Sequence, residues 1–132
     1  DIWNGVFLTP EGFRERSERL DALLREQGRA PGEVRRTMMT AVFFGRDEAE
    51  LDRRLSWRHQ QEQFAGKSLR ETVAALRESN NRIVGTPDEV VEQLSAYAAA
   101  GVEEIFLQWL DLDDIDGLRG FAESVLERVR KL

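Results

Sequence analysis

Two kinds of apolar pattern alternate along the chain, and this alternation predicts strands separated by helices. Short apolar runs occur at residues 1–8, 37–44 and 104–110. The nearly continuous runs are typical of strands that are buried on both faces of a parallel sheet. Apolar residues at helical spacing lie between and after these runs. The resulting order of strand, helix, strand, helices, strand and helix predicts an α/β fold with right-handed crossovers.

Capping residues mark the ends of two expected helices. Thr9 suits the N-terminal cap of the first helix, which Gly28 ends. Thr86 and Glu89 have the spacing of a capping box at the start of another helix, and Gly101 follows its last apolar position. Both helices are therefore predicted from local signals.

The remaining helical segments have weaker boundaries. Between residues 56 and 82 the apolar stripe is thin, which predicts two polar helices around a loop. The last helix is expected from about residue 114 to residue 130. One face of it is apolar and comprises Ile115, Leu118, Phe121, Ala122, Val125 and Val129.

The predicted sheet is too small to be complete. Parallel sheets are normally covered on both faces and do not leave long apolar edges open. Aromatic residues such as Phe43, Phe44, Phe106 and Trp109 need further structure to pack against. We therefore expect a section of a larger α/β fold, or association with another copy, of which a two-fold homodimer is the simplest form.

Composition narrows the classes of function. The 132 residues carry a net charge of −6, and since phosphate binding needs a basic surface, binding to nucleic acid is not expected. The chain has no cysteine, which excludes disulfides, thiolate metal sites and cysteine nucleophiles. It has no apolar run of about 18 residues, so no membrane-spanning helix is expected. It has no signal peptide either, and a cytoplasmic location follows as the default.

Three stretches carry recognisable motifs. The first stretch comprises DIWN at residues 1–4 and GRAP at residues 28–31. They are similar to ADGWN, a strand end, and to GRDP, two motifs of the protein family named at the end of this paragraph. The second stretch is VFFGRDEAE at 42–50. The third and most specific is IVGTPDEVVEQL at 83–94, followed by AGV at 100–102. Together these motifs resemble the C-terminal portion of the bacterial luciferase-like monooxygenase family.

The resemblance implies a partial TIM-type (β/α) barrel that comprises the last strands and helices, with residues 1–132 as a single section. It implies a parent F420- or flavin-dependent oxidoreductase or monooxygenase, with F420 or FMN as cofactor. The earlier strands, which supply most of the cofactor pocket in this family, are missing from the match. We therefore expect no turnover from this section alone, and either the N-terminal barrel section or a second copy as its partner. The alternative is a self-associating α/β module without catalysis.

Candidate site residues follow from the carboxyl ends of the strands, where barrels of this class place their active sites. The expected ends lie near Trp3 and Asn4, at residues 43–45, and near Gln108 and Trp109. Asn4 and Gln108 are candidates for hydrogen bonds to a cofactor or substrate, and Trp3 and Trp109 for walls around a flat ring. The alternative is that both tryptophans pack in the core and that Asn4 caps a loop.

Other polar groups favour structural roles. The single histidine, His59, lies among polar residues and is expected to be exposed, and without cysteine no transition-metal site is expected. The acidic segment 111–116 contains Asp113 and Asp114, either of which suits the cap of the last helix better than a cation site. The arginine clusters, including Arg53 and Arg54, are interpreted as solvated faces with partners such as Glu50 at i,i+4 spacing.

Overall fold

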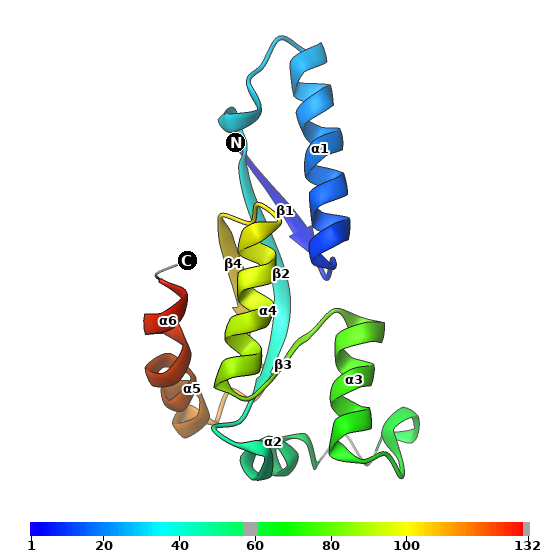
Figure 1. Cartoon of the computed structure of the whole chain (residues 1–132), viewed down its shortest axis with the longest axis vertical. Helices are drawn as coiled ribbons and strands as arrows, with labels where there is room; N and C mark the ends of the chain where they lie inside the picture. Colours follow the sequence, from blue (N-terminus) through cyan, green and yellow to red (C-terminus); the bar gives the residue numbers. More distant parts are fainter. Residues whose placement is uncertain (57–60, 131–132) are drawn as a thin grey trace.

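In a computed structural model, which describes residues 1–56 and 61–130, a parallel β-sheet packs against helices (Figure 1). The strands are β1 (Ile2–Val6), β2 (Arg35–Phe44), β3 (Ile83–Gly85) and β4 (Glu104–Gln108). The predicted α/β class and parallel pairing are therefore confirmed. The last strand ends at Gln108 rather than at residue 110.

Strand β2 is the centre of the sheet. β1 pairs with residues 35–39 of β2, and β4 pairs with residues 37–41. Because these stretches overlap, β1 and β4 lie on opposite sides of β2. The short strand β3 pairs with residues 42–44. In the part of the chain that the structure describes, no further strand pairs with β1 or β4, so these two strands are the edges of the sheet.

Helices follow the strands in the predicted order. They are α1 (Pro10–Glu26), α2 (Glu48–Leu55), α3 (Leu69–Asn80), α4 (Pro87–Ala99), α5 (Ile115–Phe121) and α6 (Glu127–Val129). A π-helical segment, Ala122–Leu126, joins α5 to α6, and 3-10 turns occupy Pro31–Glu33 and Glu62–Phe64. None of the helices within residues 1–56 and 61–130 has the length and apolar character needed to cross a bilayer.

The predicted N-terminal caps of α1 and α4 are present in the structure. The Thr9 hydroxyl accepts a hydrogen bond from the backbone N–H of Gly12 at the start of α1 (3.0 Å). At the start of α4, the Glu89 carboxylate accepts hydrogen bonds from the backbone N–H of Thr86 (2.9 Å) and from its hydroxyl (3.0 Å). This satisfies donors that a helix start would leave without partners.

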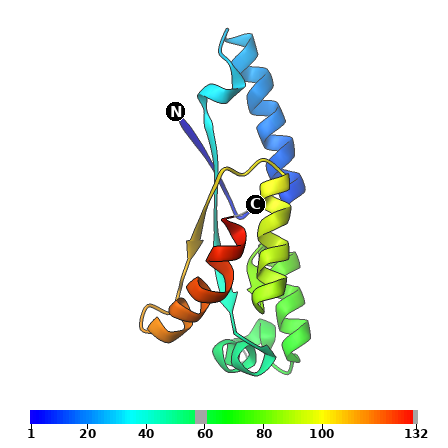
Figure 2. The same ribbon diagram turned by 60° about the vertical axis from the view of Figure 1, so that its left-hand side comes forward.

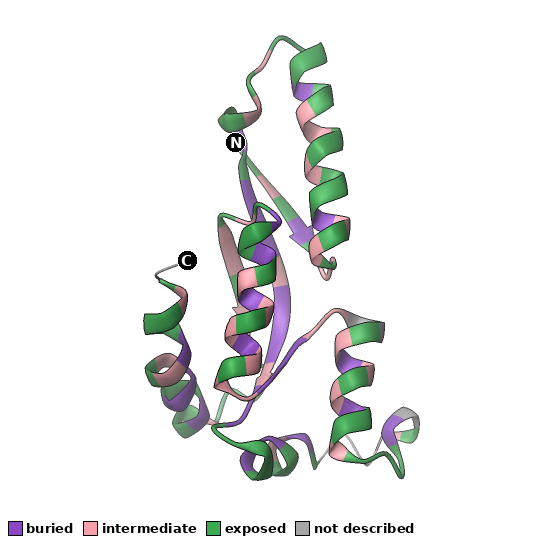
Figure 3. Ribbon diagram, viewed as in Figure 1, coloured by how far each residue is buried: buried purple, intermediate pink, exposed green. Residues whose placement is uncertain are grey.

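The larger hydrophobic core lies between β2 and the helices. Alternate residues of β2 point to this side, because side chains alternate along a strand. Figure 3 shows the buried positions along β2 and on one face of α4. The buried cluster comprises Phe13, Met38, Val42, Phe44, Ile83, Val90, Leu94, Tyr97, Phe121 and Val125.

The segment between β2 and α4 has a smaller core of its own. Its buried residues come from α2, the 3-10 turn Glu62–Phe64, α3 and β3, and comprise Leu51, Leu55, Phe64, Leu76 and Val84. Helix α3 confirms one of the two helices expected between residues 56 and 82. The other described residues of this interval include a 3-10 turn instead of a second α-helix.

The opposite side of the sheet, which we call the open face, lacks a covering layer over β1, β4 and the part of β2 that pairs with them in the described chain. At the end of β2, Phe43 and its partner Val84 pack against residues of α2 and α3. Figure 2 shows α1 and α4 on one side of β2. Paired residues of neighbouring strands share a face, so Asn4, Thr37 and Glu104 lie together on the open face. Ile2 and Phe106, on the same face by alternation, are 67% and 49% exposed.

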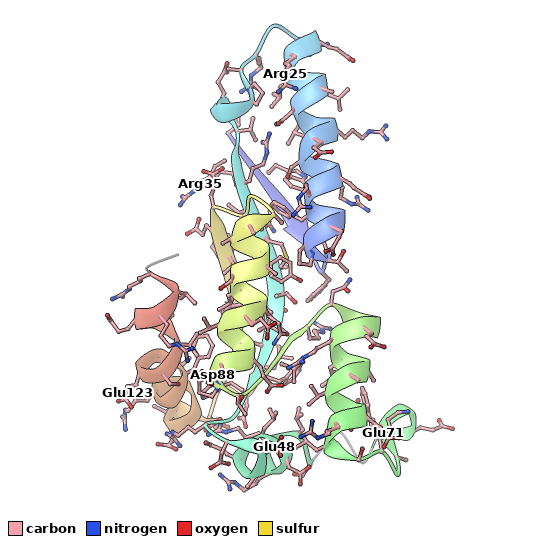
Figure 4. All side chains as sticks on the ribbon, in the orientation of Figure 1. Arg25, Arg35, Glu48, Glu71, Asp88 and Glu123 are labelled. Atoms are coloured by element: carbon pink, nitrogen blue, oxygen red, sulfur yellow. The ribbon has the colours of Figure 1, made fainter. Side chains whose placement is uncertain are left out.

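The apolar face predicted for the last helix is only partly buried. Phe121 and Val125 lie in the core, whereas Ile115 and Leu118 are exposed. No described element covers these two side chains. A salt bridge from Arg128 to Asp88 at the start of α4 (2.8 Å) fixes the end of this helical segment (Asp88 is labelled in Figure 4).

Candidate functional site at the carboxyl ends of the strands

Ligand sites of parallel α/β folds form beyond the carboxyl ends of the strands. Here β1 ends at Val6, β2 at Phe44 and β4 at Gln108. The expectation that β1 ends near Trp3 and Asn4 is therefore wrong, because the strand continues to Val6. The ends of β2 and β4 agree with the sequence analysis.

A cavity of about 350 Å³ opens between the ends of β2 and β4. Residues 42–44 of β2 form one wall, and residues 109–111, which follow β4, form the other. Arg54 of α2 and Asp114, before α5, complete the lining. We call this cavity the loop pocket. Five of the eight residues of its lining are aromatic or aliphatic, and the other three, Arg54, Asp111 and Asp114, are charged.

A network of charged side chains joins the two loops that bound the loop pocket. Glu50 of α2 is 5% exposed and accepts hydrogen bonds from the Nη1 of Arg46 (3.0 Å) and the Nη2 of Arg54 (2.6 Å). Arg54 also pairs with Asp114, and the Nη1 of Arg46 pairs with Asp116 (2.9 Å). The segment after β2 is thus held to the start of α5 at two points.

The charges of this network are stabilised by their neighbours. Burial alone would raise the pKa of Glu50, but hydrogen bonds from Arg54 and Arg46 outweigh burial and hold this pKa below its ordinary value. A hydrogen bond from Arg46 likewise lowers the pKa of Asp116. The carboxylates of Glu50 and Asp116 are therefore ionised at neutral pH.

The structure separates the four candidate residues into two pairs. Trp3 and Trp109 point to the helices: their rings lie 5.0 Å from the ring of Phe13 and 6.0 Å from that of Phe121. Trp109 also lines the loop pocket. Its buried Nε1–H has no acceptor among the described residues.

Asn4 and Gln108 lie on the open face instead. The Oδ1 of Asn4 accepts a hydrogen bond from the Thr37 hydroxyl (3.0 Å). The Nε2 of Gln108 lies 3.6 Å from the sulfur of Met39. Both amides retain capacity for further hydrogen bonds on a face without a covering layer.

The acidic segment has the predicted structural role. Asp114 is the N-cap of α5 and accepts a hydrogen bond from the backbone N–H of Gly117 (2.9 Å). Among the described residues, no group of acidic or histidine side chains has an arrangement that could hold a metal ion. His59 lies outside the residues that the structure describes.

The interpretation of the arginine clusters is wrong in part. Glu50 and Arg54 do pair at i,i+4 spacing, but Glu50 is buried rather than solvated. Arg36, in another cluster, is also buried and pairs with Asp21. Periodicity identified the partners of Glu50 on its own helix but gave no signal for Asp114 and Asp116, which are distant in sequence.

Two glycines of α5, which were not predicted from the sequence, leave space for the side chains of Arg46 and Arg54. A Cβ atom at Gly120 would lie 2.6 Å from the Nε of Arg46, and one at Gly117 would overlap the guanidinium of Arg54. Only the absence of side chains lets both arginines cross α5 so closely. The spacing G-x-x-G in a helical pattern is the one available signal.

Comparisons with known proteins agree with this fold. A family model described as luciferase-like monooxygenase matches residues 2–104. None of the curated protein sequences matches the chain. Solved structures with the same fold include an F420-dependent tetrahydromethanopterin reductase from Methanopyrus kandleri, with TM-score 0.58 and 15% identity over 92% of this chain.

Two further structures give similar values. An F420-dependent secondary alcohol dehydrogenase in complex with an F420–acetone adduct has TM-score 0.63 and 15% identity over 96% of this chain. Riboflavin lyase with modified FMN and riboflavin has TM-score 0.63 and 16% identity over 98% of it. The chain spans only 43%, 42% and 38% of the reductase, the dehydrogenase and the lyase. The match is therefore to part of a TIM-barrel fold, as predicted.

Proposed function

Because the chain belongs to the luciferase-like monooxygenase family, we propose that it is the C-terminal section of an F420- or flavin-dependent oxidoreductase. The observation that carries this proposal is the family match over residues 2–104. A sheet with two open edges and one open face supports it, because a closed barrel has neither. In this role, β1, β2 and β4 contribute part of the barrel wall and its carboxyl-end mouth.

The cofactor in this proposal is F420 or FMN, as in the dehydrogenase and the lyase. When bound, it supplies the hydride or oxygen chemistry, and the protein orients it. The amides of Asn4 and Gln108 lie on the open face and fit hydrogen bonding to a polar ring edge or to substrate. Trp109 bounds the same end of the sheet, whereas Trp3 contributes through packing against Phe13.

We further propose that residues 1–132 do not turn over substrate by themselves. The described strand ends form only one side of a site at the carboxyl ends of the barrel strands. The other side of this site must come from a complementary barrel section. The location proposed for the protein is the cytoplasm, since a chain without cysteine needs no oxidising compartment.

Intact mass spectrometry of the product of the native gene, followed by cofactor titration, tests this proposal. We expect a product heavier than 15.2 kDa that binds F420 or FMN with saturation. Gln108→Ala should weaken that binding, while Gln27→Ala, an exposed glutamine at the end of α1, should not. A longer product that binds neither cofactor would contradict the proposal.

The open face also supports a second candidate, a self-associating module in which two copies form a homodimer. Exposed apolar residues on edge strands favour association. Sedimentation of residues 1–132 should then give a dimer, which Phe106→Glu disrupts. Leu23→Glu is the matched control, because Leu23 on α1 is also 49% exposed. A clean monomer would count against this candidate.

A further inference from the structure

We infer that the loop pocket binds an uncharged aromatic group that carries an N–H or O–H donor. Binding of such a group depends only on the loop pocket. That this group is the substrate depends on the proposed function. Binding is therefore measured without any cofactor, so that the binding site and the proposed function can fail separately.

Size and lining favour an aromatic group. The volume of about 350 Å³ lies within the range of small-molecule sites. Phe43, Phe44 and Trp109 are aromatic residues of the lining, and Val42 and Leu110 are aliphatic ones. Aromatic rings pack well against other rings in offset or edge-to-face arrangements.

The charged residues of the lining disfavour anions. Arg54 is the cation of the lining, and it already pairs with the carboxylates of Glu50 and Asp114. Within the described part of the chain, the exposed carboxylate of Asp111 makes no hydrogen bond or salt bridge. The lining thus offers a free acceptor and a net negative charge. A donor group is attracted to the Asp111 carboxylate, whereas a sulfonate or phosphate is repelled.

The charged network keeps the two walls in place. Arg46 and Arg54, which follow β2, bind Asp116 and Asp114 beside the wall that follows β4. Because both connections are made between side chains of the chain itself, they favour a preformed arrangement of the two walls. A preformed site binds more tightly, since less order has to be created on binding.

Two fluorescent probes test the inference directly. N-phenyl-1-naphthylamine is uncharged and carries one N–H, and 8-anilinonaphthalene-1-sulfonate has the same rings with an added sulfonate. We expect saturable binding of the uncharged probe, at least about tenfold tighter than binding of the sulfonate, which corresponds to a 1.4 kcal/mol difference. Binding should quench Trp109 fluorescence.

Substitutions locate the bound probe. Asp111→Asn should reduce the preference for the uncharged probe several-fold. Asp113→Asn, an exposed neighbour that does not line the loop pocket, should leave it unchanged. Phe106→Ser, on the open face, should also leave binding unchanged. The inference is overturned if the sulfonate binds equally well, if Asp113→Asn acts like Asp111→Asn, or if Phe106→Ser abolishes binding.

Discussion

The substitution Gly117→Ala has two effects on stability, one on the helix propensity of α5 and one on the salt bridge between Arg54 and Asp114. Gly117 is the third residue of α5, where alanine is the better helix former. A methyl group there would overlap both the guanidinium of Arg54 and the carboxylate of Asp114, and would separate this pair. Because the end of an arginine side chain can move, we expect α5 to remain folded and the salt bridge to break.

The higher helix propensity of alanine and the loss of the bond between Arg54 and Asp114 have opposite effects on stability, and the loss is larger. Replacing glycine by alanine in a helix stabilises by up to about 1 kcal/mol. The side chains of Arg54 and Asp114 are only 18% and 20% exposed, and losing a hydrogen bond between charged groups in such a position costs about 2 kcal/mol. Gly117→Ala should therefore destabilise the native protein by about 1 kcal/mol. In an Arg54→Ala background, where this hydrogen bond is already absent, the same substitution should be about 2 kcal/mol less costly, although the Asp114 carboxylate still has to move.

Urea unfolding of the four proteins of this double-mutant cycle measures the coupling. The expected interaction free energy between Gly117 and Arg54 is about 2 kcal/mol. Circular dichroism of each folded variant checks that α5 is retained. The reasoning is refuted if Gly117→Ala changes the free energy of unfolding by the same amount, within about 0.5 kcal/mol, in both backgrounds.

Three further predictions concern the core and the titrating groups. Burial raises the pKa of Tyr97, the sole tyrosine, to about 12. Ultraviolet titration should show this value, and stability should be complete below the unfolded pKa of about 10 and fall as the pH rises beyond it. The lowered pKa of Glu50 gives stability that is present above pH 4.5 and is lost as the pH falls through the folded pKa. Glu50→Gln should therefore flatten the dependence of the urea midpoint on pH in acid. Met38→Ala, in the core, should cost about 2–5 kcal/mol on urea unfolding, whereas Phe106→Ala on the open face should cost under about 1 kcal/mol.

The order of elements was predictable because its signals are local. The apolar run of β2 and the caps at Thr9 and Thr86 act over a few residues, and the structure confirms them. The burial of Glu50 was not predictable, because it depends on the docking of α5 about sixty-five residues later in the chain. Helical spacing revealed the pair with Arg54 but not the environment of that pair.

The strand ends that bound the candidate site were predictable only in part. The ends of β2 and β4 were placed correctly, and the two tryptophans turned toward the helices, which was the weighed alternative. The end of β1 was misplaced because a short apolar run contains no stop signal before Val6. The apolar pattern of the last helix includes Ile115, which the described chain leaves exposed.

Parallel titration of F420 and of FMN against the product of the native gene and against residues 1–132 decides whether the chain is one section of a cofactor-binding barrel. We expect saturable binding of one cofactor to a product heavier than 15.2 kDa, and neither binding nor turnover by residues 1–132. Saturable binding with turnover by residues 1–132 alone would contradict it.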